Sequence, residues 1–329
     1  MQKKLLITGV LLLCIAIVCA PWLNSLDDNK SRPPIRISIS PNTVFELFHL
    51  AEKKGFFKDE GVSVKLIRLS ALEDARRSYV RGQVDGMTGA LTELIKAREN
   101  GRESRILFVV DSSNGADVII ARKGINNISD LKGKKIAIEP ESFGLSILAG
   151  TLEKAGLSFN DVNLKGMNQL NIPQALLSGE IDAAHSYAPY SVSLLKNNPH
   201  ISVIIDSSQI KDEIFDVLAI DPRVIKQRPD DMKAIKRAWD KAYAYSLAHP
   251  KEANLLMAEI ENISQQDFTE DLKKTRIFTS ADTANLIKSG GAIEQSLIKV
   301  NSILHRENPP VEALRISDYI LPDNDNPGQ

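Results

Sequence analysis

A pattern of three short segments in the first third of this chain nearly repeats about one hundred residues later. The matched pairs are 36–43 with 135–142, 52–55 with 153–156, and 82–86 with 179–183. Because the three matches occur in the same order at almost the same spacing, they predict two lobes of similar build. Two such lobes meet in a cleft, and clefts of this kind are where small ligands usually bind.

Short apolar strands alternate with helix-like segments in both halves of the repeat. The predicted strands are 35–40, 62–67, 84–87 and 106–110 in the first half and 136–138, 181–184 and 201–205 in the second. Thr43 and Ser142 precede helical periodicity and are predicted to cap the helices that follow. Alternating strands and helices are typical of parallel βαβ units, so we expect an α/β fold with covered sheets.

Two further apolar runs, 117–121 and 216–220, bracket the second half. We interpret them as the strands by which the chain leaves the first lobe and returns to it. The mostly helical region after Asp221 is expected to pack on the first lobe as support. The predicted division is lobe 1 at 35–118 plus 218–322, lobe 2 at 119–217, and a disordered tail at 323–329.

The N-terminus has the layout of a bacterial export signal. Lys3 and Lys4 precede an apolar run from Leu5 to Cys19, so residues 1–22 are predicted to be a signal peptide or an N-terminal membrane anchor. Cleavage, lipidation at Cys19 and retention all place the rest of the chain in the periplasm or another extracytoplasmic space. Residues 23–34 are a polar linker that ends in two prolines.

Several classes of function are disfavoured by the sequence. A net charge of −1 and a pI near 6.6 leave no electrostatic footprint for nucleic acid. The chain has no nucleophile elbow, phosphate loop or zinc-protease motif, and its five histidines lack metal-ligand spacing. Both cysteines lie in the leader, so the folded part has no disulfide. We therefore expect no catalysis, no cofactor and no metal site.

Polar, small and aromatic residues follow the predicted strands, at the sheet edge that faces ligands in open α/β folds. The candidate ligand-binding residues are Thr43, Phe45, Ser70, Thr88, Gly89, Ser113, Asn114, Asp117, Ser142, Phe143, Tyr187, Tyr190 and Asp216. The helix starts at Thr43 and Ser142 would each favour an anion by about 0.3–1 kcal/mol. Alternatives remain open: these two could serve only as caps, and Phe45 and Phe143 could belong to the core. Asp117 and Asp216 could be hinge residues or could recognise a ligand amine.

Six segments in fixed order resemble a family of ABC-transporter solute receptors that includes nitrate-, sulfonate- and taurine-binding proteins and thiamine-precursor binders. The segments are 50–57, 61–64, 82–85, 113–117, 130–137 and 177–183. The resemblance spans roughly 36–245 and implies a two-lobed periplasmic-binding-protein fold (type II), with mixed five-stranded sheets, flanking helices and two crossing hinge strands. It also implies binding without catalysis. Ala188 is a departure, because family members often carry an acid before the proline at this position.

The resemblance implies an extracytoplasmic solute-binding protein, monomeric, whose partners are a small-molecule ligand and an ABC permease in the inner membrane. A sulfonate-type organic anion is our first expectation for the ligand, with taurine-like and nitrate-like anions in the same class. No lysine or arginine falls squarely in the predicted loops, which disfavours nitrate. An aminosulfonate or an aminopyrimidine thiamine precursor would also use a carboxylate and stacking rings. The rival functions are a membrane-anchored sensor subunit and an enzyme of pyrimidine metabolism.

Overall fold

The computed structural model describes residues 32–209, 214–306 and 314–321. The predicted leader at 1–22, most of the linker and the predicted tail at 323–329 lie outside these residues. No helix in the described part of the chain is long and apolar enough to cross a membrane.

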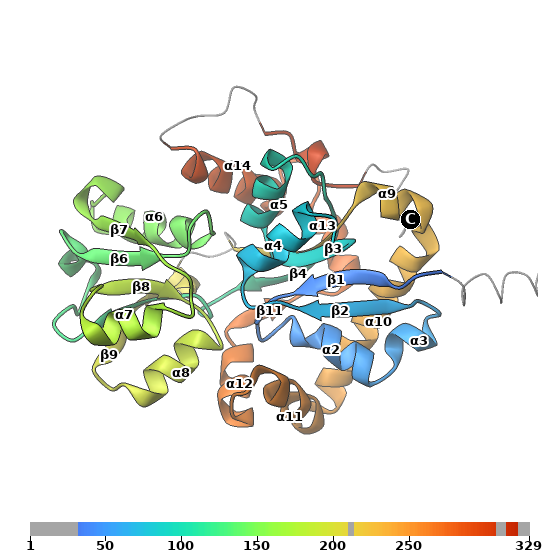
Figure 1. Ribbon diagram of the computed structural model, residues 1–329, viewed down its shortest axis with the longest axis horizontal. Helices are drawn as coiled ribbons and strands as arrows, with labels where there is room; N and C mark the ends of the chain where they lie inside the picture. Colours follow the sequence, from blue (N-terminus) through green and yellow to red (C-terminus); the bar gives the residue numbers. More distant parts are fainter. Residues whose placement is uncertain (1–31, 210–213, 307–313, 322–329) are drawn as a thin grey trace, which may run out of the picture.

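Two mixed β-sheets form two lobes, the smaller on the left of Figure 1 and the larger on the right. The larger sheet has the order β11-β4-β10-β3-β1-β2, and the smaller has the order β7-β6-β8-β5-β9. The larger sheet contains β1 (Ile35–Ile39), β2 (Val64–Arg68), β3 (Gly86–Ala90), β4 (Arg105–Ser113), β10 (Phe215–Ile220) and β11 (Thr275–Ile277). The smaller contains β5 (Val118–Arg122), β6 (Lys135–Ile138), β7 (Asn163–Gly166), β8 (Ala183–Ser186) and β9 (Ile201–Asp206).

Strand direction follows the same scheme in both sheets. In the larger sheet β1 is parallel to β2 and β3, while β10 is antiparallel to β3 and β4. In the smaller sheet β6 is parallel to β7 and β8, while β5 is antiparallel to β8 and β9. The predicted α/β class with mixed sheets is confirmed. The larger sheet has six strands rather than five, because three residues of the C-terminal region pair with the end of β4. A strand that short carries no alternating pattern.

Helices flank both sheets. They are α2 (Glu46–Lys53), α3 (Phe56–Asp59), α4 (Leu72–Val80), α5 (Leu91–Glu99), α6 (Gly144–Lys154), α7 (Ile172–Ser178), α8 (Tyr190–Asn197), α9 (Pro222–Gln227), α10 (Pro229–Ala248), α11 (Pro250–Glu261), α12 (Gln265–Leu272), α13 (Thr283–Leu286) and α14 (Ala292–Leu304). Short 3₁₀ turns occur at Ile128–Leu131, Phe159–Asp161, Ser207–Gln209, Ser280–Asp282 and Ile316–Asp318.

The core of the larger lobe is built around three rings. Trp239 of α10 packs against Phe48 of α2 and Phe108 of β4, with ring centroids 4.8 and 5.4 Å apart. All three side chains are fully buried, and the Trp239 indole donates a hydrogen bond to the carbonyl oxygen of Phe278 (3.0 Å). The helix that begins at Pro229 therefore supports the larger sheet, as its apolar periodicity predicts.

The chain crosses between the sheets twice, once after β4 and once after β9. The crossings are hydrogen-bonded to each other, because Ser113 Oγ lies 2.6 Å from Ser207 Oγ and the Gly115 N–H donates to Ser207 Oγ (2.7 Å). Residues 210–213 of the second crossing lie outside the described part. All of β10 pairs within the larger sheet from Phe215 onward, so the predicted lobe boundary between 217 and 218 is slightly too late. The polar turn at Ser207–Gln209 precedes the change of sheet.

Thr43 does not cap a helix, contrary to the sequence-based prediction, whereas the Ser142 hydroxyl accepts from the N–H of Gly144, the first residue of α6 (3.2 Å). The α2 helix begins three residues after Thr43, and the side-chain oxygen of Asn42 accepts from the Val44 N–H (2.8 Å) in a local turn. The Ser142 hydroxyl donates to the carbonyl oxygen of Glu139 (2.8 Å), and α6 begins at Gly144. In both lobes a turn separates the strand from its helix, which frees Thr43 for another contact.

Candidate ligand site between the two lobes

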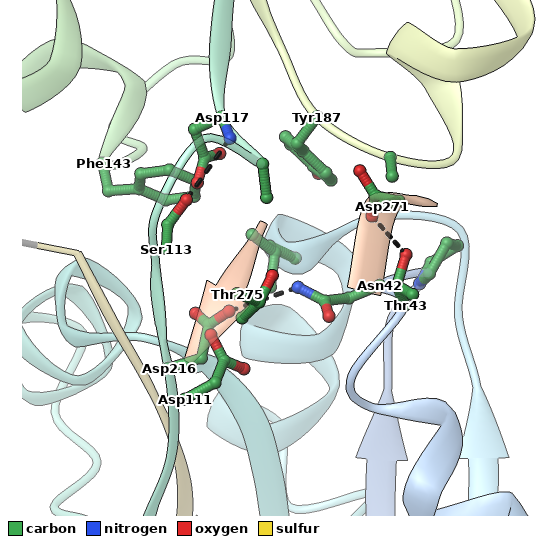
Figure 2. Close-up of a pocket in the computed structure, with 14 residues that line it drawn as sticks. Asn42, Thr43, Asp111, Ser113, Asp117, Phe143, Tyr187, Asp216, Asp271 and Thr275 are labelled. Carbon is green, nitrogen blue, oxygen red and sulfur yellow. Dashed lines mark hydrogen bonds between the residues drawn. The ribbon is translucent and has the colours of Figure 1, made fainter. Parts of the chain in front are cut away.

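A small cavity lies between the lobes, where the strand ends of both sheets converge (Figure 2). Its volume is about 30 Å³, the space of one or two water molecules. Its lining residues are Pro41, Asn42, Thr43, Leu72, Asp111, Ser113, Ala116, Asp117, Phe143, Tyr187, Ala188, Asp216, Asp271 and Thr275. A cavity of this size admits an organic solute only if the lobes move apart, so the structure has the character of a closed form.

The two lobes contribute different chemistry to the cavity. The larger lobe supplies Asp111 near the end of β4, Asp216 near the start of β10 and Asp271 near the end of α12. The smaller lobe supplies the rings of Phe143 and Tyr187, which lie on the turns after β6 and β8. Figure 2 shows the rings on the opposite side of the cavity from Asp111 and Asp216. A fourth acid, Asp117, comes from the first crossing.

Asp111 and Asp216 form a buried acid pair on neighbouring strands. They are register partners between β4 and β10, and their exposed fractions are 2% and 8%. Burial, with the charges of Asp216 and Asp117 nearby, raises the pKa of Asp111 well above its usual value. Burial, with the charges of Asp117 and Glu93, raises the pKa of Asp216 to about 8. One oxygen of each carboxyl, Asp111 Oδ2 and Asp216 Oδ1, has no hydrogen-bond partner.

Neutral polar side chains hold two of these acids in place. The Asn42 amide donates to Asp216 Oδ2 (3.2 Å), while its own oxygen is bound to the Val44 N–H. The Thr43 hydroxyl donates to Asp271 Oδ2 (2.6 Å), and burial nevertheless raises the pKa of Asp271. The turn after β1 thus positions acids that come from distant parts of the chain.

Asp117 contacts a buried histidine of the smaller lobe. Its Oδ1 atom lies 3.3 Å from His185 Nε2, and its backbone N–H donates to Ser113 Oγ (3.3 Å). The His185 ring also packs edge-on against Phe143, with centroids 5.2 Å apart. A side chain at Gly144 would place Cβ only 2.6 Å from the His185 ring, so the start of α6 requires glycine there.

The aromatic wall continues from the cavity to its rim. Tyr187 packs against Phe143 and Tyr190, with ring centroids 6.2 and 5.7 Å apart. The Tyr190 hydroxyl donates to the backbone carbonyl oxygen of Ser70 in the larger lobe (2.7 Å). Tyr190 and Ser70, both predicted site residues, therefore form a contact between the lobes and do not line the cavity.

Six predicted site residues line the cavity: Thr43, Ser113, Asp117, Phe143, Tyr187 and Asp216. The remaining predicted site residues lie outside the cavity. Phe45 is fully buried in the core, and Thr88 and Gly89 lie inside β3, where the Thr88 hydroxyl bonds to the Ser38 carbonyl oxygen (3.3 Å). Ser142 is held by Glu139. Asn114 is exposed on the crossing, and its backbone N–H donates to the Lys274 carbonyl oxygen.

Sequence reasoning missed several lining residues. Asp111 directly follows the predicted strand 106–110, so the rule that selected the other candidates could have found it. Asp271 and Thr275 carry no such signal, because they reach the cavity only where the C-terminal region folds back onto β4. Although four aspartates line the cavity, no group of three or more acids, histidines or cysteines among the described residues could hold a metal ion.

A second set of contacts joins the lobes outside the cavity. We call Arg76, Lys96 and Glu141 the interlobe latch, since Glu141 of the smaller lobe lies 3.3 Å from Arg76 Nη2 and 3.1 Å from Lys96 Nζ of the larger. Glu141 has a left-handed backbone (φ 56°), an uncommon conformation for a residue other than glycine. Lys196 and Asp267 form another ion pair between the lobes (2.6 Å).

Two buried glutamates lie beside the latch. Burial is the main cause that raises the pKa of Glu93 in the larger lobe and that of Glu139 in the smaller lobe, each to about 7. The Glu93 charge contributes to the rise at Glu139, while Arg76, 3.4 Å from Glu93, opposes the rise at Glu93. The closed arrangement therefore brings acids of both lobes into one poorly solvated region.

Comparison with known proteins connects these features to a family. The profile of the family described as NMT1/THI5 like matches residues 42–253, more than half of the chain. A binding protein of Brucella abortus, so named provisionally, is 24% identical over 186 residues, which cover 56% of this chain and only 58% of that protein. A Bacillus subtilis protein, provisionally named an aliphatic sulfonates-binding protein, is 24% identical over 80% of each chain.

Solved structures share the fold. The periplasmic aliphatic sulphonate binding protein from Escherichia coli has a TM-score of 0.72 at 17% identity, covering 89% of this chain and 93% of that one. A ligand-binding component of an ABC-type import system from Staphylococcus aureus has a TM-score of 0.74 at 15% identity, covering 90% and 98%. These similarities confirm the periplasmic-binding-protein fold and the resemblance seen in the sequence. The chain belongs to the NMT1/THI5-like family.

Proposed function

We propose that this protein is an extracytoplasmic solute receptor, which captures a small molecule by closure of its two lobes and delivers it to a membrane permease. The observation that carries the proposal is the cavity itself, since Asp111 and Asp216 of one lobe face Phe143 and Tyr187 of the other. The lining residue Ser113 is not arranged as a catalytic nucleophile. The Ser113 hydroxyl contacts Ser207 Oγ and the Asp117 N–H rather than a general base.

Closure follows from the connections between the lobes. The chain leaves the larger sheet after β4 and returns to it at the start of β10, so rotation about these two connections separates the acids from the rings. In the closed form the Tyr190–Ser70 hydrogen bond and the interlobe latch join the two lobes. A solute bound between the lobes would add contacts that only the closed form makes, and it would shift the equilibrium toward closure.

The names of relatives support two ligand classes. Several similar proteins are named for aliphatic sulfonates, which supports the organic anion expected from the sequence. Another relative, 22% identical, is a formylaminopyrimidine-binding protein from Halalkalibacterium halodurans. The lining residues favour a ligand with N–H donors over a sulfonate, because four of them are aspartates and none is a lysine or arginine.

An enzymatic function is the alternative suggested by the names of two other similar proteins. One relative, 22% identical, is named a pyrimidine phosphate synthase, and one structural neighbour is a desulfurization enzyme. We propose capture without turnover, because the lining residues contain no cysteine, histidine or lysine to act as a nucleophile. Loss of 4-amino-5-hydroxymethyl-2-methylpyrimidine, or release of sulfite from an alkanesulfonate, on incubation with the purified protein would contradict this.

Thermal unfolding of the purified protein with candidate solutes tests the receptor function. The panel contains ethanesulfonate, taurine, 4-amino-5-hydroxymethyl-2-methylpyrimidine and its N-formyl derivative. A bound solute at one hundred times its Kd stabilises the protein by about 2.7 kcal/mol, which we expect to raise Tm by about 5 °C or more. Small-angle scattering must then show a smaller radius of gyration on binding. Binding without this change would contradict closure.

Native mass spectrometry of protein isolated from its host gives an independent test. A solute receptor is expected to retain a fraction of its ligand as a discrete added mass that disappears on partial unfolding and dialysis. If no added mass is found and no compound of the panel moves Tm, the receptor function is wrong.

A further inference from the structure

We infer that the ligand of this cavity carries a positively charged nitrogen group, an ammonium or an amidinium, which binds between Asp111 and Asp216. The inference rests on the proposed receptor function, because it names the ligand class of the same site. It goes beyond the names of the relatives, which specify sulfonates and a formylaminopyrimidine.

The first support is the geometry of the acid pair. Asp111 and Asp216 face each other across the β4–β10 ladder, both more than nine-tenths buried. Each directs a carboxylate toward the cavity, as Figure 2 shows, and each keeps one oxygen without a hydrogen-bond partner. Buried polar atoms without partners are rare and costly in native proteins. A group that donates two N–H bonds would satisfy both free oxygens at once.

The second support is the charge of everything around the pair. Asp117 approaches from the first crossing and Asp271 from α12, while Glu93 of α5 acts on Asp216 from farther away. Asn42, the side chain bonded to Asp216, is neutral. The basic groups nearby lie closer to other acids: His185 contacts Asp117 and Arg76 contacts Glu93, while the charge of Lys274 acts to lower the pKa of Asp271. The lining acids therefore favour a cation over an anion at the pair, because no basic side chain lines the cavity.

The third support is the opposite wall. Phe143 and Tyr187 present ring surface across from the acids. Leu72, from α4 of the larger lobe, is a further apolar lining residue. Ring faces attract cations, and they also accommodate an apolar or planar body. A ligand with a cationic end toward the larger sheet and an apolar end toward the smaller lobe would match both walls. A sulfonate would place its charge against carboxylates.

Proton release is a specific consequence. In the unliganded cavity the raised pKa of Asp111 and that of Asp216 keep the pair partly protonated near neutral pH. A cation between the carboxyls favours their ionised forms, so binding expels about one proton from the pair to solvent. A neutral or anionic solute gives no such release. Calorimetric titration at pH 7 in two buffers of different ionisation enthalpy measures the number of protons released.

Benzamidine, benzamide and benzoate form the decisive probe set, because they share size and shape and differ in charge. Acetamidine, acetamide and acetate repeat the comparison without the ring. We expect the amidinium of at least one set to bind ten times or more tighter than its amide, with about one proton released. We expect no detectable binding of either carboxylate.

Two isosteric variants test whether the amidinium binds at the acid pair. Asp216→Asn and Asp111→Asn should each weaken amidinium binding by about thirtyfold or more and lower the number of protons released. Because each replaces an acid in a repulsive buried cluster by a neutral group, both should fold with a Tm at least equal to that of the parent. Asp230→Asn, at an exposed position of α10, is the matched control and should change nothing.

The outcomes separate this inference from the function on which it rests. If ethanesulfonate binds and closes the lobes while neither amidinium does, the ligand class is wrong and solute capture stands. If an amidinium binds with unchanged affinity in both variants, the acid pair is not its site and the inference is wrong. If no probe of any charge binds and native mass spectrometry shows no added mass, both the inference and the receptor function are wrong.

Discussion

The two walls of the cavity differ in their chemical groups and in the secondary structure that carries those groups. On the acid wall, Asp111 and Asp216 lie within hydrogen-bonded strands, and Asn42 is anchored by its own turn. On the aromatic wall, Phe143 and Tyr187 lie on turns after strands of the smaller sheet. The carboxyl groups of Asp111 and Asp216 therefore lie on the larger lobe, where the hydrogen-bonded strands fix their positions. The smaller lobe contributes ring surface, whose contacts tolerate small changes of position better than directional bonds do.

Removal of the central ring of the larger lobe gives the largest expected effect. Trp239→Ala should lower the free energy of unfolding by about 3–5 kcal/mol, because it deletes a fully buried ring that packs on Phe48 and Phe108. Urea denaturation measures the change. Trp239→Phe, which keeps a ring but loses the hydrogen bond to Phe278, should cost less. A loss below 1 kcal/mol for the alanine variant would show that this lobe does not depend on its ring cluster.

The buried glutamates beside the latch should make stability depend on pH. With a pKa of about 7 in the folded protein and about 4.5 when unfolded, Glu93 and Glu139 are protonated in the fold at pH values where the unfolded chain is ionised. The unfolded state then binds fewer protons, so the free energy of unfolding falls as pH rises from about 4.5 to about 7. The loss is on the order of 3 kcal/mol per carboxyl at most.

Other buried acids contribute to the same trend, so the test compares variants. Glu93→Gln and Glu139→Gln should each flatten the decline between pH 5 and 7, as measured by urea denaturation at several pH values. Glu103→Gln, at a site with a half-exposed side chain, is the control. If the two buried variants follow the parent curve throughout, these carboxyls are not protonated in the fold.

Tyr187 tests the aromatic wall. Tyr187→Leu should weaken binding of benzamidine by roughly five- to thirtyfold, because a stacked or cation–π contact is worth about 1–2 kcal/mol when desolvated. Tyr187→Phe should bind almost as the parent does, since the hydroxyl makes only a long 3.4 Å contact with Glu139. Isothermal titration checks both. Equal losses in the two variants would assign the role to the hydroxyl rather than the ring.

The interlobe latch should have the smallest effect. Glu141→Gln removes a charge from a half-exposed side chain, and exposed ion pairs contribute only about 0.2–1 kcal/mol. We expect ligand affinity to fall about two- to fivefold at low salt and the difference to vanish at high salt. Glu153→Gln, exposed on α6 of the same lobe, is the control. Salt-independent loss would mean that Glu141 does not act through these ion pairs.

Particular residues show where prediction from sequence succeeds and fails. The predicted crossing strands pointed to Asp117 and Asp216, and the rule that ligands meet the carboxyl ends of strands pointed to Ser113 and Tyr187; all four line the cavity. The rule failed at Phe45 and Thr88, because it gives a position along the chain but not the direction of a side chain. Ala188 is informative: family members often carry an acid there, whereas here a methyl group lines the cavity and the acids come from the other lobe.

The order of strands and helices, the near repeat and the family motifs were determined by the sequence alone, because each depends on local periodicity or on residues close together in the chain. Only the tertiary structure decided the character of the cavity. Asp111, Asp117, Asp216 and Asp271 are separated by up to 160 residues, and nothing local marks them as neighbours. Their convergence depends on β-strand register, the two crossings and the returning C-terminal region. Burial side by side raises the pKa of Asp111 and that of Asp216, and it leaves one oxygen of each carboxyl without a hydrogen-bond partner.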